Sequence, residues 1–448
     1  MKRYFLLLLL FSSLALADDQ AATASMLRDK ALDSTKGWDI VESLTTEVGP
    51  RLAGTDADKR AVRWAKALLE QSRDAGVFDR VWLEPVSFPI WQRHREQARV
   101  VSPYPQPLTI TALGYSGSTD GEITAEVIAF PNLASLQEAD EKLVAGKIVF
   151  INQPMFRDRE GAGYAEVVPN RYAAGSVAKE KGAVAALIRS AGTDSHRFPH
   201  SGASTREDDP LPAAALSAPD AEQLQRILDR GETLTVALDI NVSEQPGGES
   251  YNVIAQIDGR VDAKKVVLIA AHLDSWDLGT GAIDDGAGVA ITVAAAQLIG
   301  ELPQRPKHSV RVVLFANEEQ GIWGAKAYAE QHKDELKNHL FASESDFGAG
   351  PVWRFDSANE ALMNKAMPHL AALSIEKGGE ASSAGPDITP LLEAGVPIFQ
   401  LQQDGIDYFD YHHTADDTLD KIDAKDLQQN IAAWAVVTFL AAEDLGSE

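Results

Sequence analysis

The sequence of 448 residues contains no cysteine, so the chain forms no disulfide and cannot bind a metal through thiolates. Positive charge is also scarce. Against 66 aspartates and glutamates stand 41 lysines and arginines, which gives a net charge of −25. Nucleic acids and anionic membranes bind basic surfaces, so this composition argues against both as partners.

The N-terminus has the layout of a cleavable signal peptide. Two basic residues precede the apolar run at 5–11, and the small residues at 15–17 come directly before Asp18. The run is too short to span a bilayer comfortably. We therefore expect removal of residues 1–17 and a periplasmic or secreted protein with no stable membrane insertion.

The length predicts two domains rather than one compact core. From residue 251 onward, apolar strands alternate with helices, which is typical of a three-layer α/β/α sandwich around a mostly parallel mixed sheet. The expected strands lie at 253–257, 266–271, 310–315 and 396–401, and the expected helices at 286–302, 324–332 and 424–445.

Between residues 102 and 245 the sequence pattern predicts short strands, turns and small helices. We expect strands at 146–150 and 183–188, a helix at 173–182 and a surface loop at 195–212. Before this region, a strand at 81–88 is expected to end at Pro89. We interpret 102–245 as a domain inserted into a catalytic domain made of 18–101 and 246–448.

Acidic residues and one histidine follow two of the expected strands. Clustered carboxylates repel one another unless protons or cations neutralise them, so the pattern favours a divalent metal. Imidazole and carboxylate are ordinary zinc ligands. The residues are His272, Asp274, Asp284 and Asp285 after the first strand, and Glu318 and Glu319 after the second.

A second group of polar residues precedes the last expected helix. It begins at Tyr411 and contains His412, His413, Asp416 and Asp417. Taken alone, these residues fit a solvated surface patch as well as a functional loop. The upstream acids lack a second imidazole, which this loop can supply.

These motifs resemble the family of zinc-dependent aminopeptidases and glutamate carboxypeptidases, and within it the carboxypeptidase Q branch. Nearly all of the chain after the signal segment shares the likeness, and 102–245 is similar to a protease-associated domain. The short segments that resemble the carboxypeptidase Q branch are at 49–52, 187–190, 272–277, 318–321, 344–346 and 394–397. The family motifs occur in order as His272-x-Asp274, Asp284-Asp285-Gly286, Glu318-Glu319, Asp346 and His413-Thr414-x-x-Asp417-Thr418.

The resemblance implies two zinc ions per chain with assigned roles for each residue. Asp284 would bridge the metals, Glu318 would be the general base, and Asp274 would orient a histidine ligand. His272 and Asp346 would complete one metal site, and Glu319 and His413 the other. The chain departs from the wider family at Asp285, where asparagine is usual, and at Asn317, where small residues are common.

The same resemblance implies hydrolysis of dipeptides or short peptides with free termini, by a homodimer. A water activated by the two metals would attack the peptide carbonyl. We consider three further residues for substrate contact: Asp387, Tyr411 and His200.

Three other functions remain open from the sequence. An aminopeptidase acting on longer peptides would share every metal residue. A receptor or scaffold without catalysis should have lost ligands or Glu318, and this sequence has lost none. Calcium bound only for stability would favour an all-oxygen site, against which His272 and His413 argue.

Overall fold

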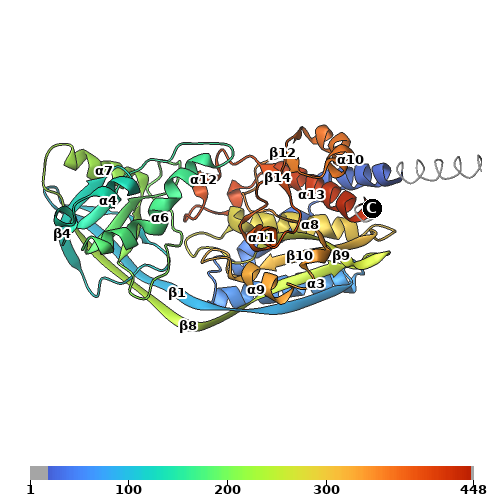
Figure 1. Ribbon diagram of the computed structural model, residues 1–448, viewed down its shortest axis with the longest axis horizontal. Helices are drawn as coiled ribbons and strands as arrows, with labels where there is room; N and C mark the ends of the chain where they lie inside the picture. The colour runs from blue at the N-terminus through green and yellow to red at the C-terminus, as the bar shows by residue number, and fades with distance from the viewer. Residues whose placement is uncertain (1–18, 445–448) are drawn as a thin grey trace, which may run out of the picture.

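The computed structural model describes residues 19–444, so the expected signal peptide, 1–17, lies outside the described residues. Two parts of the molecule lie side by side and are linked by two long antiparallel strands, β1 (Arg80–Ser102) and β8 (Thr235–Ile257). Figure 1 shows this ribbon running beneath both parts. β8 pairs with β10 in one part and with β4 in the other, so a single sheet of 11 strands continues through the whole molecule.

The expectation that a strand ends at Pro89 is wrong, because β1 continues to Ser102. Proline has no N–H to donate to a neighbouring strand, and it is tolerated in a strand at irregular positions. Pro89 is such a case. The register between β1 and β8 shifts between Phe88 and Ile90, so Pro89 is skipped in the pairing.

The part that contains both chain ends is built on three parallel strands, β9 (Asp262–His272), β10 (His308–Phe315) and β11 (His339–Glu344). β9 lies in the centre, and β8 pairs antiparallel to β10 on the other side. The strand residues are buried on both faces, as expected for a parallel sheet covered by helices.

Helices cover both faces of this sheet and complete the three layers that the sequence predicts (Figure 1). Alternate residues of β9 contact opposite helix layers: Ile269 belongs to the cluster of the first layer and Leu268 to that of the second. The first layer comprises α2 (Lys36–Ser43), α3 (Asp56–Asp74), α8 (Ala287–Gly300), α10 (Glu360–Leu370) and α13 (Ala424–Asp444), and the second α9 (Trp323–Gln331) and α11 (Thr389–Glu393).

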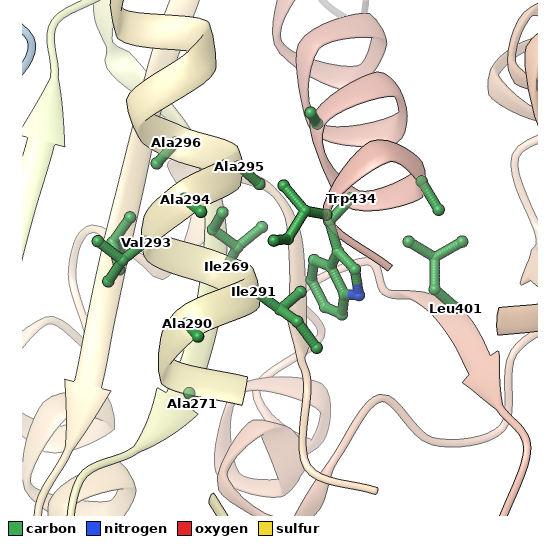
Figure 2. Packing of buried hydrophobic residues seen from close by; sticks show 14 of the residues in the cluster. Ile269, Ala271, Ala290, Ile291, Val293, Ala294, Ala295, Ala296, Leu401 and Trp434 are labelled. Atoms are coloured by element: carbon green, nitrogen blue, oxygen red, sulfur yellow. The ribbon is translucent and has the colours of Figure 1, made fainter. Parts of the chain in front are cut away.

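The centre of the first layer is α8, in which every residue is buried. Its many alanines allow close approach of its neighbours, and the Trp434 indole of α13 and Ile291 of α8 point toward each other in the core (Figure 2). Of the helices in the described residues, one segment, Ala282–Gly300, is long and apolar enough to cross a bilayer, but it is wholly buried in this core.

The other part contains most of residues 102–245, the region that we interpret as an insertion. Four parallel strands form its centre, and one cluster of buried side chains lies entirely within it. Its kinship with a protease-associated domain stays a prediction. Its elements are β2 (Gln106–Leu108), β3 (Ile110–Ala112), β4 (Ile123–Phe130), α4 (Leu133–Glu138), α5 (Glu141–Val144), β5 (Ile148–Ile151), α6 (Ala162–Glu180), β6 (Ala185–Arg189), β7 (Ala213–Leu216) and α7 (Ala218–Leu228).

Two expectations for this region need correction. The helix expected at 173–182 is α6, which begins at Ala162 and continues through Pro169. The loop at 195–212 is irregular as expected, but its middle, 200–203, is buried rather than exposed. It is buried because the Ser201 N–H donates to the His413 carbonyl of the other part, at 2.9 Å.

A small second sheet lies beside the first, formed by β12 (Val352–Ser357), β13 (Glu376–Lys377) and β14 (Phe399–Gln403). The strand expected at 396–401 is β14, which starts three residues later and pairs antiparallel with β12. Just before β14, Ile398 forms a single parallel bridge to Ala342 of β11 in the main sheet. After it, α12 (Tyr408–Tyr411) leads to the histidine pair.

Candidate metal centre

Asp284 lies at the centre of a group of buried histidines and carboxylates. Its Oδ1 is 3.0 Å from Nε2 of His272, and its Oδ2 is 3.1 Å from Nε2 of His413. Each histidine has a second carboxylate beside it: His272 Nε2 is 3.5 Å from Asp346 Oδ1, and His413 Nε2 is 2.9 Å from Glu319 Oε2. The two oxygens of Asp284 therefore face two separate histidine and carboxylate pairs.

The sheet explains why these residues meet. His272 is the last residue of β9, Asp346 follows the end of β11 by two residues, and Glu319 follows the end of β10 by four. Parallel strands end at the same edge of a sheet, and loops at that edge form the sites of open α/β folds. His413 arrives from the loop after α12.

Neighbouring residues hold in place the two loops that carry Asp284 and His413. Oδ1 of Asp417 accepts the N–H groups of Ala282 and Ile283, both at 2.7 Å, and so ties the histidine loop to the Asp284 loop. The buried Arg51 donates to the carbonyls of Thr280 (2.7 Å) and Gly281 (2.9 Å) in the same loop.

Asp285 joins two elements through its carboxylate. Oδ2 accepts the N–H of His272 at 3.1 Å, and Oδ1 accepts the N–H of Gly288 at 3.0 Å. An asparagine has one acceptor oxygen only, so it could satisfy one of these donors. The aspartate at this position thus anchors the start of α8 to the end of β9.

The buried carboxylates around Asp284 need bound cations to be ionised together. Burial alone would lower the pKa of His413, but Glu319 and Asp284 outweigh burial and raise that pKa to about 9. Burial and the neighbouring Asp346 raise the pKa of Glu344 to about 8, and burial and nearby acids hold the pKa of Glu318 well above its usual range. Several carboxylates in a dry site ionise together only with added positive charge.

The donor set fits zinc. Oδ2 of Asp284, Oε1 of Glu319 and Oδ1 of Asp346 are buried and have no hydrogen-bond partner among the described residues. Two trios of ligand atoms each lie within 4.8 Å of one another: His272, Asp284 and Asp346, and Asp284, His412 and His413. Ligands about 2.0–2.2 Å from a tetrahedral zinc ion lie about 3.4 Å apart, which is inside this limit.

Neither trio contains Glu319 or Glu318, and His412 occupies the third place in the second trio. Glu319 nevertheless pairs with His413, whereas Glu318 makes no ion pair with a histidine of the described residues. Glu318 is partly exposed and lines a cavity of about 950 Å³ that also reaches Asp284, Asp346 and His413. A carboxylate in this position can take a proton from a water molecule between it and the ligand group.

Comparison with known proteins agrees with this geometry. The sequence model of Peptidase family M28 matches residues 252–438. Carboxypeptidase Q of Mus musculus is 34% identical over 91% of this chain and 86% of its own length, and the Homo sapiens protein is 34% identical over 91% and 85%. The chain belongs to peptidase family M28.

Solved structures have the same fold as this chain. The crystal structure of a peptidase M28 precursor from Shewanella amazonensis is 45% identical, covers 96% of this chain and 98% of its own, and superposes with a TM-score of 0.93. A zinc aminopeptidase from Bacillus subtilis, at 19% identity and a TM-score of 0.67 over 92% and 95% of the two chains, supports the fold alone. The expected membership of a family of zinc-dependent exopeptidases is confirmed.

Asp274 lies beside the ligand group. Nδ1 of His272 is 3.1 Å from the main-chain oxygen of Asp274 and 3.7 Å from its Oδ1. Of the two adjacent histidines, His413 is closer to the acids, whereas His412 Nε2 is 3.5 Å from Asp284 Oδ2 and stacks on the His413 ring at 3.5 Å.

The three residues considered for substrate contact lie outside the lining of the cavity. Asp387 is fully buried behind the wall, and its N–H donates to Glu344. Tyr411 packs against the hydrophobic core, with the Lys421 ammonium 5.5 Å from its ring centre. His200 is buried between Asp194 and the main-chain oxygen of His412. Neighbouring residues do line the cavity, among them Tyr408.

Sequence reasoning missed the part of the wall that α6 contributes. Tyr164, Arg171 and Tyr172 line the cavity from this helix. No local motif marks them, because only the packing of the 102–245 region against the histidine loop brings them to the site. Stacking of Tyr164 on Phe409 at 4.6 Å is one such contact.

Proposed function

We propose that the chain is a metallopeptidase that hydrolyses dipeptides or short peptides with free termini and holds two zinc ions. The observation that carries this proposal is the position of Asp284, whose two oxygens face different histidine and carboxylate pairs. His272 and Asp346 would hold one ion, Glu319 and His413 the other, and Asp284 both. Bound zinc would supply polarisation of the peptide carbonyl and a lowered pKa of water.

The protein's own groups then handle the protons. Glu318 would accept a proton from the attacking water and transfer it to the leaving amine. The histidines need their Nε2 atoms free of protons, so each donates through Nδ1. Acceptors are in place, since His272 Nδ1 lies 3.1 Å from the Asp274 carbonyl and His413 Nδ1 lies 3.3 Å from the Ser201 carbonyl.

The Glu318→Gln substitution tests this function. We expect the purified variant to keep the zinc content of the wild type and to lose activity on a dipeptide panel about 10³-fold, because the amide cannot take up the proton. Glu330→Gln, at an exposed side chain of α9, serves as the control and should match the wild type. Failure of the wild type to take up zinc, or near-normal activity of Glu318→Gln, would contradict the proposal.

Substrate length is tested by comparing a free dipeptide with a longer peptide that has the same N-terminal residue. Preference for the dipeptide supports the proposal, and preference for the longer peptide favours an aminopeptidase. A non-catalytic receptor or scaffold predicts no hydrolysis of either.

We also propose that the protein is exported and forms a homodimer. Export rests on the signal-like residues 1–17, and the dimer rests on the family resemblance. Sequencing of the mature N-terminus should start at Asp18, and sedimentation analysis should give twice the mass of the mature chain.

A further inference from the structure

Arg171 is a cation in the cavity wall with an incomplete set of partners. It comes from the middle of α6 and is 5% exposed. Its Nε is buried and has no hydrogen-bond partner among the described residues. No carboxylate of the described residues lies within ion-pair distance of its guanidinium.

The other cationic side chains that line the cavity are more exposed and already bind an acceptor. Arg171 therefore differs from them in both burial and pairing. Arg206 pairs with Glu244 at 2.6 Å, Arg354 pairs with Glu160 at 2.9 Å, and Lys326 donates to the Gly321 carbonyl at 2.9 Å.

The guanidinium of Arg171 is fixed in its position. Its Cζ lies 5.5 Å from the ring centre of Tyr164 and 5.0 Å from that of Tyr172, so two aromatic rings contact it. A β-carbon at Gly202 would lie only 2.3 Å from Nη1, so the glycine leaves the space that the guanidinium occupies. A group held in this way loses little conformational entropy when it binds a ligand.

The Tyr164 and Tyr172 hydroxyls pair with the guanidinium of Arg171, but its Nε has no acceptor among the described residues. Nη2 donates to the Tyr172 hydroxyl at 3.3 Å, and Nη1 lies 3.5 Å from Nδ1 of His413. When His413 uses Nε2 for the acids and the metal, its Nδ1 carries a proton and donates to the Ser201 carbonyl. In that tautomer the His413 Nδ1–H cannot accept a hydrogen bond from Nη1. Nη1, like Nε, then keeps an N–H that can donate to a ligand.

We propose that Arg171 binds the free C-terminal carboxylate of a dipeptide substrate. A guanidinium with two unused N–H groups matches the two oxygens of a carboxylate. A dipeptide has its carboxylate one residue, about 3.8 Å, beyond the scissile bond, and Arg171 lies next to the ring of a metal ligand, His413. The inference rests on the proposed function and assigns its substrate class, because a longer peptide has a neutral amide at that place.

The test compares alanyl-leucine with alanyl-leucine amide, using the zinc-loaded full-length mature protein. The readout is the ratio of kcat/KM for the free acid to kcat/KM for the amide. We expect the wild type to prefer the acid, and Arg171→Gln to reduce this ratio about 10- to 100-fold, mainly through a higher KM for the acid. Arg206→Gln, which alters a paired arginine of the same cavity, should keep the wild-type ratio.

Arg171→Lys keeps the charge but not the planar fork, and it should give an intermediate ratio; it carries the test if Arg171→Gln does not fold. An equal loss on both substrates would mean that Arg171 only supports the structure, and it would overturn the assignment. So would a wild type that cleaves acid and amide equally well. A wild type with no peptidase activity overturns the proposed function itself, and the assignment with it.

A third substrate separates two sources of carboxylate. Alanyl-glutamate amide has an acidic side chain but a neutral C-terminus. Slow, Arg171-independent cleavage of this amide supports binding of the C-terminal carboxylate. Fast cleavage that is lost in Arg171→Gln would overturn that assignment in favour of an acidic side chain.

Discussion

Oδ1 of Asp274 accepts a hydrogen bond from the main-chain N–H of Glu318, with 3.0 Å between the two atoms. The sequence motif predicts that Asp274 orients His272, and the structure gives the carboxylate a closer partner in the residue proposed as general base. Nδ1 of His272 is 3.7 Å from the same oxygen. One aspartate thus contacts both a proposed metal ligand and the proposed base.

Two substitutions separate these contacts. Asp274→Asn keeps an oxygen that can accept the Glu318 N–H but lacks the negative charge, whereas Asp274→Ala lacks both. If positioning of Glu318 is the main role, kcat should fall about 100-fold in Asp274→Ala and about 10-fold or less in Asp274→Asn. Steady-state kinetics at matched zinc content measure this, and equal losses would instead assign the effect to the charge.

Asp285→Asn should destabilise the fold. The amide would place an NH₂ group against one of two main-chain donors, the N–H of His272 or that of Gly288, and leave that donor unsatisfied. The expected loss in the free energy of unfolding is about 1–3 kcal/mol. Urea unfolding with excess zinc measures it, with Asp33→Asn at an exposed position as the control. Unchanged stability of Asp285→Asn would show that the two hydrogen bonds are not needed.

His200→Ala should weaken the contact between the two parts of the molecule. Nε2 of His200 is 2.5 Å from Oδ2 of Asp194, and its Nδ1 is 2.7 Å from the main-chain oxygen of His412. The side chains of His200 and Asp194 are almost fully buried. Removing one member of a buried pair costs about 3 kcal/mol. We expect a lower midpoint in urea, and an Asp194→Ala, His200→Ala double mutant that is little worse than either single one. Additive losses would mean that the two side chains act independently.

The stability of the protein should depend on His339 in acid. Arg311 donates to the Tyr328 hydroxyl, which contacts Nε2 of His339 at 2.9 Å. Burial and the charge of Arg311 lower the pKa of His339 to about 4, against about 6.5 in an unfolded chain. Between these values the unfolded state binds more protons, so this stabilising contribution is complete above pH 6.5 and is lost as the pH falls toward 4.

The loss from this one group amounts to about 3 kcal/mol. In urea unfolding at pH 7, 5 and 4, His339→Gln should therefore be less sensitive to acid than the wild type, because glutamine does not take up this proton. His196→Gln, in an exposed loop, should follow the wild-type curve. If the curves of wild type and His339→Gln run parallel, the histidine does not contribute in this way.

The sequence allowed the catalytic half of the fold to be predicted, since the alternation of apolar strands and helices after residue 251 is regular. It also pointed to the residues around Asp284, because parallel strands bring their ends to one edge and the acids follow those ends directly. The second histidine was chosen by its spacing to Asp417, and the structure places its Nε2 2.9 Å from Glu319.

Contacts between segments far apart in the chain could not be predicted from the sequence. Pro89 is expected to end a strand, yet β1 continues past it because the pairing with β8 skips this residue. The helix expected at 173–182 begins earlier, at Ala162, and contains Pro169. The loop around His200 has a polar composition typical of a surface, and it is buried by a contact with a segment more than 200 residues away. Arg171 carries no motif at all.

The long β1–β8 ribbon has an evolutionary consequence. It lets one polypeptide place the residues proposed to bind metal in one part of the molecule and a share of the cavity wall, including Arg171, in the other. Mutations in that second part can alter which molecules are accepted while the chemistry stays intact. Substrate preference can therefore evolve through substitutions in 102–245 while every intermediate sequence keeps its hydrolytic residues.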